Sequence, residues 1–159
     1  LTSNLQFNMT TLKNYLDLTK RPPRSARVRL GGYAMLPRIL DKARASIDGN
    51  AGDYIYGNPM DQNFLRFTGI SQESLLATVA SGKGDWEILK WVNLKAVPKR
   101  FPHEIRAWSA QLETAPIGDA EDFEWFTEQV KRIHPGRTDL HSVIDYLDAD
   151  DHVSFGGHA

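Results

Sequence analysis

The residues best suited to chemistry lie in an arginine-rich segment near the start of the chain. Five cations fall within ten residues: Lys20, Arg21, Arg24, Arg27 and Arg29. Guanidinium groups are planar forks that match carboxylates and phosphates, and the Gly31-Gly32 pair that follows can let backbone N–H groups approach an anion. The spacing predicts an anion-binding pocket held by Arg21, Arg24 and Arg29. The alternative is that this segment is an irregular arm, residues 19–34, held by salt bridges to an acidic surface of the same domain.

A second polar group lies on a helix predicted over 36–47, where Leu36, Ile39, Leu40 and Ala43 form an apolar stripe. Its polar face carries Arg38, Asp41, Lys42 and Arg44. Arg38 and Asp41 are three residues apart and can pair on a solvated helix face. Alternatively, both project into a cleft that they share with the basic arm.

In that cleft, Arg38 would join the arm in holding the anion. Asp41 or Asp61 would serve as a general base if the site is catalytic, and Tyr56 and Trp86 would form the wall. The pocket requires the arm to fold over the 36–47 helix and to leave a concave space. The sequence does not decide between binding and catalysis.

Several tryptophans lie off the apolar stripes of their helices. On a helix predicted over 86–96, the residues off the apolar stripe are Trp86, Trp91 and Leu94. This position indicates that a second helix, a subunit or a ligand covers them. Trp125 lies on the far side of its helix from the apolar residues and is the best candidate for an exposed interface anchor.

Strings that resemble metal and nucleotide sites lack the required atoms. A zincin helix starting at His103 needs a second His four residues later, where the chain has Ala107. A phosphate-binding loop ending at Lys83 needs Gly at position 77 and a hydroxyl at position 84, where the chain has Ala77 and Gly84. We therefore expect no metal site and no organic cofactor.

Hydrophobic periodicity predicts an all-α fold, a compact bundle of six to seven short helices with an irregular N-terminal basic arm and at most one small hairpin. Further helices are expected over 9–18, 60–67, 72–80, 86–96, 103–114 and 120–134, with a last helix capped by Thr138. Ser71 and Asp85 are expected caps. Residues 53–57 read as extended or as a brief strand.

The ends of the chain suggest a simple organisation: a tag or flexible start over 1–12, a single helical domain over 13–150 and a polar tail over 151–159. The acidic cluster Asp148, Asp150, Asp151 and His152 is expected to be solvated. No export signal or membrane-length apolar run occurs, which favours a cytoplasmic protein without membrane contact.

Charge is separated along the chain, although the net charge is only −1. Residues 13–44 carry nine Lys or Arg against two Asp, residues 45–103 are neutral, and residues 104–159 carry four Lys or Arg against twelve Asp or Glu. The two ends should attract, either within one chain or between chains. The balanced total makes nucleic acid an unlikely partner.

A family resemblance rests on a run of short motifs. They are Asp17-Leu18-Thr19-Lys20-Arg21-Pro22-Pro23-Arg24-Ser25, Val28-Arg29-Leu30-Gly31-Gly32-Tyr33, Leu36-Pro37-Arg38, Asp41-Lys42-Ala43-Arg44 and Pro59-Met60-Asp61-Gln62. Over roughly residues 13–155 the chain resembles the bacterial domain-of-unknown-function family 5069. The resemblance implies a mostly helical, cytoplasmic single domain and assigns no catalytic residue.

The function that these observations favour is binding, with transformation left open, of an anionic small molecule between the basic arm and the 36–47 helix. The alternative is a protein-interaction or self-association module, a homo-oligomer that uses exposed Trp and its complementary charged ends.

Overall fold

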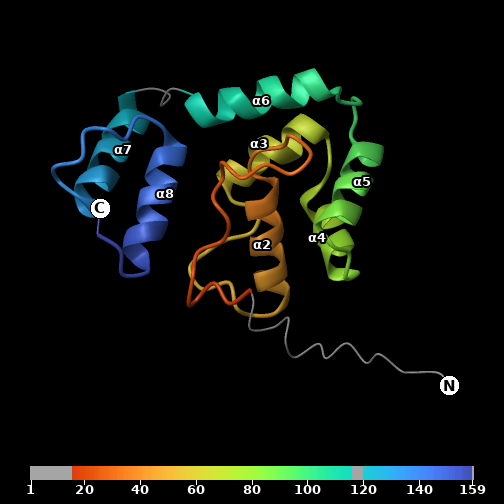
Figure 1. The fold of residues 1–159 in the computed structure, drawn as a ribbon, viewed down its shortest axis with the longest axis horizontal. Coiled ribbons are helices and arrows are strands. Elements are labelled where there is room, and N and C mark those ends of the chain that lie inside the picture. Colours follow the sequence, from red (N-terminus) through yellow and green to blue (C-terminus); the bar gives the residue numbers. More distant parts are fainter. Residues whose placement is uncertain (1–15, 116–119, 159) are drawn as a thin grey trace.

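The computed structural model describes residues 16–115 and 120–158 (Figure 1). These residues contain seven helices, which are α2 (Leu36–Ile47), α3 (Pro59–Thr68), α4 (Gln72–Ala80), α5 (Asp85–Lys95), α6 (Pro102–Thr114), α7 (Ala120–Ile133) and α8 (Val143–Ser154). The start proposed over 1–12 and most of the helix predicted over 9–18 lie outside the described residues. The all-α prediction is confirmed.

No strand occurs in the described part of the chain, so the strand considered over 53–57 is wrong. Within residues 16–115 and 120–158, the only trace of a hairpin is a tight turn in which Leu30 and Tyr33 exchange two backbone hydrogen bonds of 3.0 and 3.1 Å. Gly31 occupies this turn with φ +59°, and an added Cβ would lie 2.5 Å from the side chain of Leu89. Gly31 therefore allows close packing against α5.

The helix starts follow their caps. Ser71 accepts a hydrogen bond from the Ser74 N–H at the start of α4, as predicted. The last helix starts at Val143 and not after Thr138, because Ser142 accepts from the Asp145 N–H while the Asp145 carboxylate accepts from the Ser142 N–H.

The predicted C-terminal tail is also corrected, since α8 continues to Ser154. Asp151, expected in solvent, is 7% exposed. Asp148 accepts from the side chains of Ser25 and Arg27. The acidic cluster therefore belongs to the folded body.

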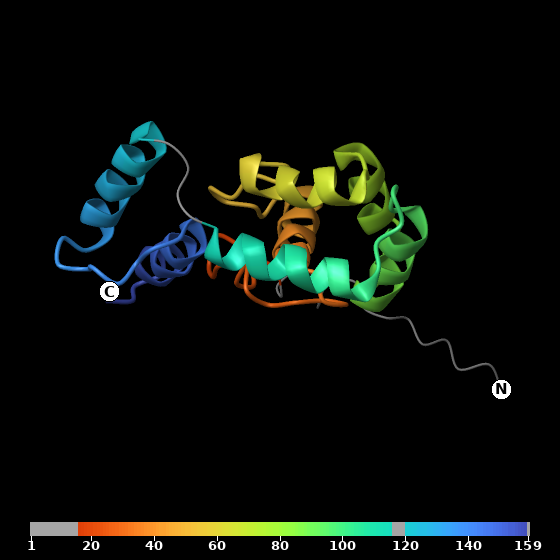
Figure 2. The ribbon, with the colours of Figure 1, turned by 90° about the horizontal axis from the view of Figure 1, so that it is seen from above.

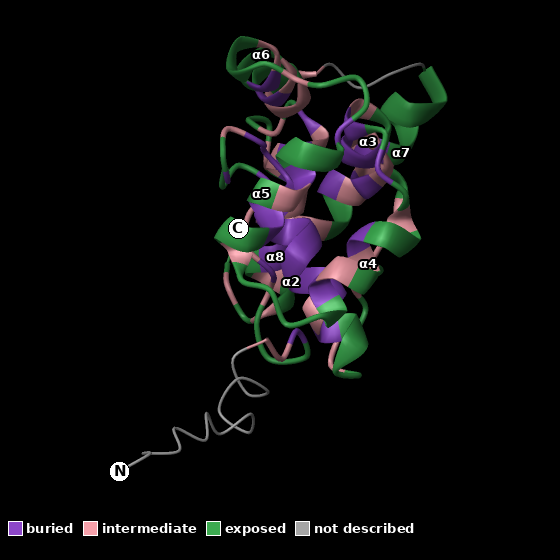
Figure 3. Cartoon of the chain, turned by 90° about the vertical axis from the view of Figure 1, so that its right-hand side faces the viewer, coloured by how far each residue is buried: buried purple, intermediate pink, exposed green. Residues whose placement is uncertain are grey.

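Helix α2 runs through the middle of the molecule, and buried residues gather along it (Figures 1 and 3). Pro37 occupies its first turn, where a missing N–H costs nothing. Nine of its twelve residues are buried, including Arg38, Asp41 and Lys42. The prediction of a solvated polar face is therefore wrong: neighbouring elements cover both sides of this helix.

The apolar core consists of two clusters. The main one joins α2 to residues of the arm, α3, α4, α5, α6 and Ile144 of α8. A smaller one holds α7 against α8 through Phe126, Val130 and Tyr146. Helix α8 thus connects the two clusters. None of the helices in the described residues has the length and apolar character needed to cross a membrane.

The most deeply buried charges in α2 and α3 form one pair. Lys42 Nζ donates to Asp61 Oδ1 at 2.7 Å and to the Ile55 carbonyl at 3.2 Å, and the two charged side chains are 1% and 0% exposed. The other Asp61 oxygen accepts from the Gly57 N–H at 2.8 Å. Burial lowers the pKa of Lys42, and the attraction of Asp61 opposes that shift.

We predict that Asp61→Ala lowers the free energy of unfolding by about 3 to 5 kcal/mol, because it leaves the Lys42 ammonium buried without its counter-charge. Urea unfolding measures the loss. Glu128→Ala is the matched control, since it removes one partner of an exposed pair with Lys131 and should cost less than about 1 kcal/mol. Equal losses in the two variants would contradict this role.

Candidate functional site

The site is built around the charged residues of α2, because each of them reaches a different element. The pairs are Arg38 with Asp151 of α8 (2.7 Å), Asp41 with Arg24 of the arm (2.8 Å), Lys42 with Asp61 of α3 (2.7 Å) and Arg44 with Asp85 of α5 (2.7 Å). Arg38 and Asp41 do not pair with each other, which corrects the i,i+3 expectation.

Arg24 joins the arm to two helices. Its Nε and Nη2 donate to the two oxygens of Asp41 at 2.9 and 2.8 Å, and its backbone N–H donates to Asp41 Oδ2 at 2.9 Å. Its Nη1 donates to Asp85 Oδ2 at 2.7 Å. The arm therefore folds over α2, as the pocket prediction required, and a bidentate pair fixes its direction.

Asp85 is the first residue of α5 and does not cap the helix as predicted. Its two oxygens accept from Arg24 and Arg44, both at 2.7 Å, while the side chain of Glu87 accepts from the Gly84 N–H. Desolvation alone would raise the pKa of Asp85, but the hydrogen bonds and charges of the two arginines outweigh it and hold that pKa below its ordinary value of 3.8.

A groove of about 1060 Å³ opens beside this network, between the arm, the second half of α2, the end of α4 and the turn before α5. This volume is at the upper end of the usual range for small-molecule sites. Its apolar wall includes Leu18, Pro22, Pro23, Ile47 and Val79.

The polar lining of the groove carries both signs of charge. Its cations are Arg21, Arg24, Arg44 and Lys83, and its anions are Asp41, Asp48 and Asp85. Arg24 satisfies both oxygens of Asp41, and Asp85 accepts from Arg24 and Arg44. Arg21 and Lys83 are exposed at the rim.

The groove contains three of the predicted site residues, Arg21, Arg24 and Asp41. Two other predicted anion ligands lie outside it. Arg29 Nε donates to Glu113 of α6 at 3.1 Å. Arg38 is 3% exposed, bonds Asp151 with both Nη atoms and stacks over the ring of Tyr54, whose hydroxyl also donates to Asp151.

The predicted wall and second base also lie outside the groove lining. The Tyr56 hydroxyl donates to the Gln72 carbonyl at 2.7 Å. Burial, and to a smaller extent the negative charges of Asp61 and Glu73, raise the pKa of Tyr56. Trp86 is 69% exposed on α5. Asp61 is fully buried against Lys42.

The sequence reasoning missed three features of the groove. Lys83 lies in a Gly-Lys-Gly turn that was discounted because it lacks the rest of a phosphate-binding loop. Asp85 was interpreted as a cap, and Arg44 as part of a solvated face. A signal for these three residues exists only in the fold, because Arg44 of α2 meets Asp85 of α5 and the Lys83 carbonyl across two elements.

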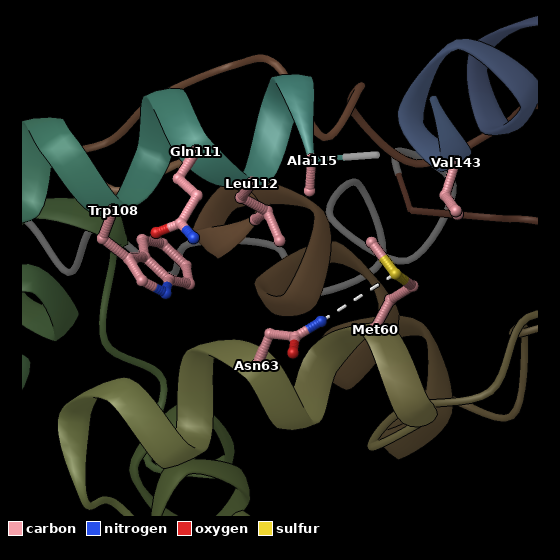
Figure 4. A pocket seen from close by; sticks show the side chains of 7 residues that line it. All are labelled: Met60, Asn63, Trp108, Gln111, Leu112, Ala115 and Val143. Atoms are coloured by element: carbon pink, nitrogen blue, oxygen red, sulfur yellow. Dashed lines mark hydrogen bonds between the residues drawn. The ribbon is translucent and has the colours of Figure 1, made fainter. Parts of the chain in front are cut away.

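A second cavity, of about 290 Å³, lies between α3, α6 and the start of α8 (Figure 4). Its lining is mainly apolar, with Met60, Trp108, Leu112 and Val143. Among the described residues, those that line it include no charged side chain and none of the predicted site residues.

No group of three or more His, Asp or Glu in residues 16–115 and 120–158 is placed to hold a metal ion. The polar lining of the groove includes paired guanidinium and carboxylate groups and the exposed cations Arg21 and Lys83.

Fold and site together define a small all-α protein whose central helix is ion-paired to the elements around it and borders a charged groove. The family whose model matches residues 20–153 is described as Domain of unknown function (DUF5069), and the chain belongs to that family. No curated protein matches the chain.

We predict that Asp85→Asn lowers the free energy of unfolding by about 1 to 3 kcal/mol at neutral pH, because Arg24 and Arg44 lose their shared anion. The folded pKa of Asp85 lies below its unfolded value, so these ion pairs stabilise the protein above that value and are lost as the pH falls through the folded pKa. The stability difference should therefore shrink toward acid pH.

Urea unfolding of both proteins over a pH series measures this difference. The control is Asp53→Asn, which removes an exposed carboxylate outside the groove lining. If the difference in unfolding free energy between the unaltered protein and Asp85→Asn stays constant down to acid pH, the ionised Asp85 carboxylate is not the source of that stability.

Proposed function

We propose that the groove between the arm and α2 binds a small anionic molecule that has an apolar part. The observation that carries the proposal is the lining of the groove, which combines the exposed cations Arg21 and Lys83 with an apolar wall. Sites for small molecules combine such apolar walls with a few polar groups that fix orientation. The family is described as a domain of unknown function, so the proposed ligand is argued from the geometry of the groove alone.

The cations of the groove divide into two kinds. Arg24 is ion-paired with Asp41 and Asp85, so its charge mainly stabilises the fold. Arg44 uses Nη1 for Asp85, and its Nη2 lies 3.4 Å from the Lys83 carbonyl. The Lys83 ammonium donates to the Ser81 hydroxyl at 3.2 Å, and Lys83 is exposed. We assign Lys83 and Arg21 to the ligand, since both are exposed residues of the groove lining.

Acid–base catalysis by Asp41 or Asp85 is disfavoured in this groove. A general base needs an oxygen that can reach the substrate proton, but Arg24 donates to both oxygens of Asp41, and Arg24 and Arg44 together occupy both oxygens of Asp85. Asp61, the other proposed base, lies outside the lining.

A thermal-shift screen of anionic metabolites, followed by calorimetric titration of any hit, tests the proposal. Arg21→Ala and Lys83→Ala should each weaken binding about tenfold or more, since a hydrogen bond to a charged group contributes about 1.5 to 3 kcal/mol. Added salt should weaken binding further.

Lys99→Ala is the matched control, because it removes an exposed cation outside the groove. It should bind the hit as the unaltered protein does. A hit whose affinity is the same in Arg21→Ala and Lys83→Ala would contradict the assignment of this groove. Arg24→Ala is a poor test, because it also strips Asp41 of its partner.

Self-association is a second candidate function, favoured by apolar side chains that the described fold leaves exposed. Trp86 and Leu94, which were expected to be covered, are 69% and 79% exposed, and Trp125 is 51% exposed. None of these residues lines the groove, so association and ligand binding are compatible.

A further inference from the structure

One side of α5 is an apolar strip on the outside of the molecule. Trp86, Lys90 and Leu94 follow one another at four-residue spacing, which places them along one side of a helix. Val97, just beyond the helix, extends the exposed apolar surface and is 74% exposed. The buried side of the same helix carries Ile88, Leu89 and Val92. We call the exposed strip of Trp86, Lys90, Leu94 and Val97 the α5 face.

The surroundings of the α5 face are basic. Within residues 86–99, the exposed charged residues are Lys90, Lys95 and Lys99 against Glu87. An apolar strip with a basic border fits a partner surface that combines an aromatic anchor with acidic residues.

Helix α7 presents such a surface. Trp125 contacts Tyr146 edge to face at 5.8 Å and leaves half of its side chain exposed. Glu124 precedes it and Glu128 lies one turn after it, both exposed, and Glu128 is paired with Lys131 at 3.0 Å. We call Glu124, Trp125 and Glu128 the α7 face.

The two faces lie at opposite ends of the molecule. Helices α5 and α7 are on opposite sides of the central α2 in one view and remain at opposite ends after a quarter turn (Figures 1 and 2). A pair of molecules joined through one face of each kind therefore leaves one free face at either end. Such a contact is heterologous and extends into an open chain or closes into a ring.

We propose that the partner of the α5 face is the α7 face of a second copy of this chain, so that the protein associates head to tail. The inference rests on the second candidate function, self-association, and adds which surfaces meet. Apolar contact between Trp86, Leu94 and Trp125 provides the centre of the interface. Lys90 facing Glu124 provides the charge complementarity, with Glu128 shared between Lys90 and its neighbour Lys131, and this makes association weaker at high salt.

Light scattering on a sizing column tests the inference through two variants that each block one face. Trp86→Ser with Leu94→Ser blocks the α5 face, and Glu124→Lys with Trp125→Ser blocks the α7 face. Circular dichroism should show helicity equal to that of the unaltered protein, since all four side chains are exposed. Ile55→Ser, which alters a 68% exposed residue outside both faces, is the control.

The unaltered protein and the control should form particles of two or more chains, with a mass that rises with concentration. Each blocked variant alone should run as one chain of 17.9 kDa. An equal mixture of the two should give a particle of twice that mass and no larger one, because only one pair of intact faces remains.

Three results would overturn the inference. A single-chain mass for the unaltered protein at every concentration would remove self-association altogether. Association of either variant alone at the level of the unaltered protein would leave self-association standing and remove the head-to-tail contact. A mixture that stays at the single-chain mass would also remove that contact.

Discussion

The fold depends on one constraint, which is that the charged residues of α2 are covered by other elements and each needs a partner. A buried charge without a counter-charge is destabilising by several kcal/mol. Each of the four charged residues of α2 finds its partner in a different element: α8, the arm, α3 and α5. These directional contacts fix how α8, the arm, α3 and α5 are placed and oriented against α2. Apolar packing alone is less directional and would fix that placement only weakly.

The same constraint explains the separation of charge along the sequence. The basic first third and the acidic last third meet within one chain, where Arg27 reaches Asp145 and Asp148 and Arg38 reaches Asp151. The basic arm is therefore largely held by salt bridges to acidic residues of the same chain, which is the alternative that the sequence offered to an anion-binding pocket. A groove nevertheless remains beside it, because Arg24 draws the arm and the start of α5 toward α2 without closing the space between them.

Local features of the fold could be predicted from the sequence, whereas distant pairings could not. The 36–47 helix and the Ser71 cap follow from apolar spacing and from one side chain near one backbone N–H. Ser142 was missed as a cap because Thr138 offers the same chemistry four residues earlier. Arg38 and Asp151 are 113 residues apart, and no local spacing indicates that they meet.

The candidate site shows the same division. The density of arginines in the sequence indicates Arg21 and Arg24 as candidates, and both residues line the groove. Arg29, Arg38, Tyr56 and Trp86 were grouped with them by residue type alone, and the fold distributes these four over other contacts and surfaces. The polar face of α2 was assigned to solvent because an amphipathic pattern shows which residues differ in polarity and does not show what covers them.

Native-state hydrogen exchange of Asp151→Asn tests most directly whether the charges of α2 hold individual elements. The variant removes the negative charge of the side chain to which Arg38 and Tyr54 both donate. The amides of α8 should therefore exchange faster, while those of α3, α4 and α5 keep their original rates. Asp139→Asn, which alters an exposed pair with Arg137, should leave all rates unchanged. Unchanged protection in α8, or an equal loss of protection in every helix, would contradict the account.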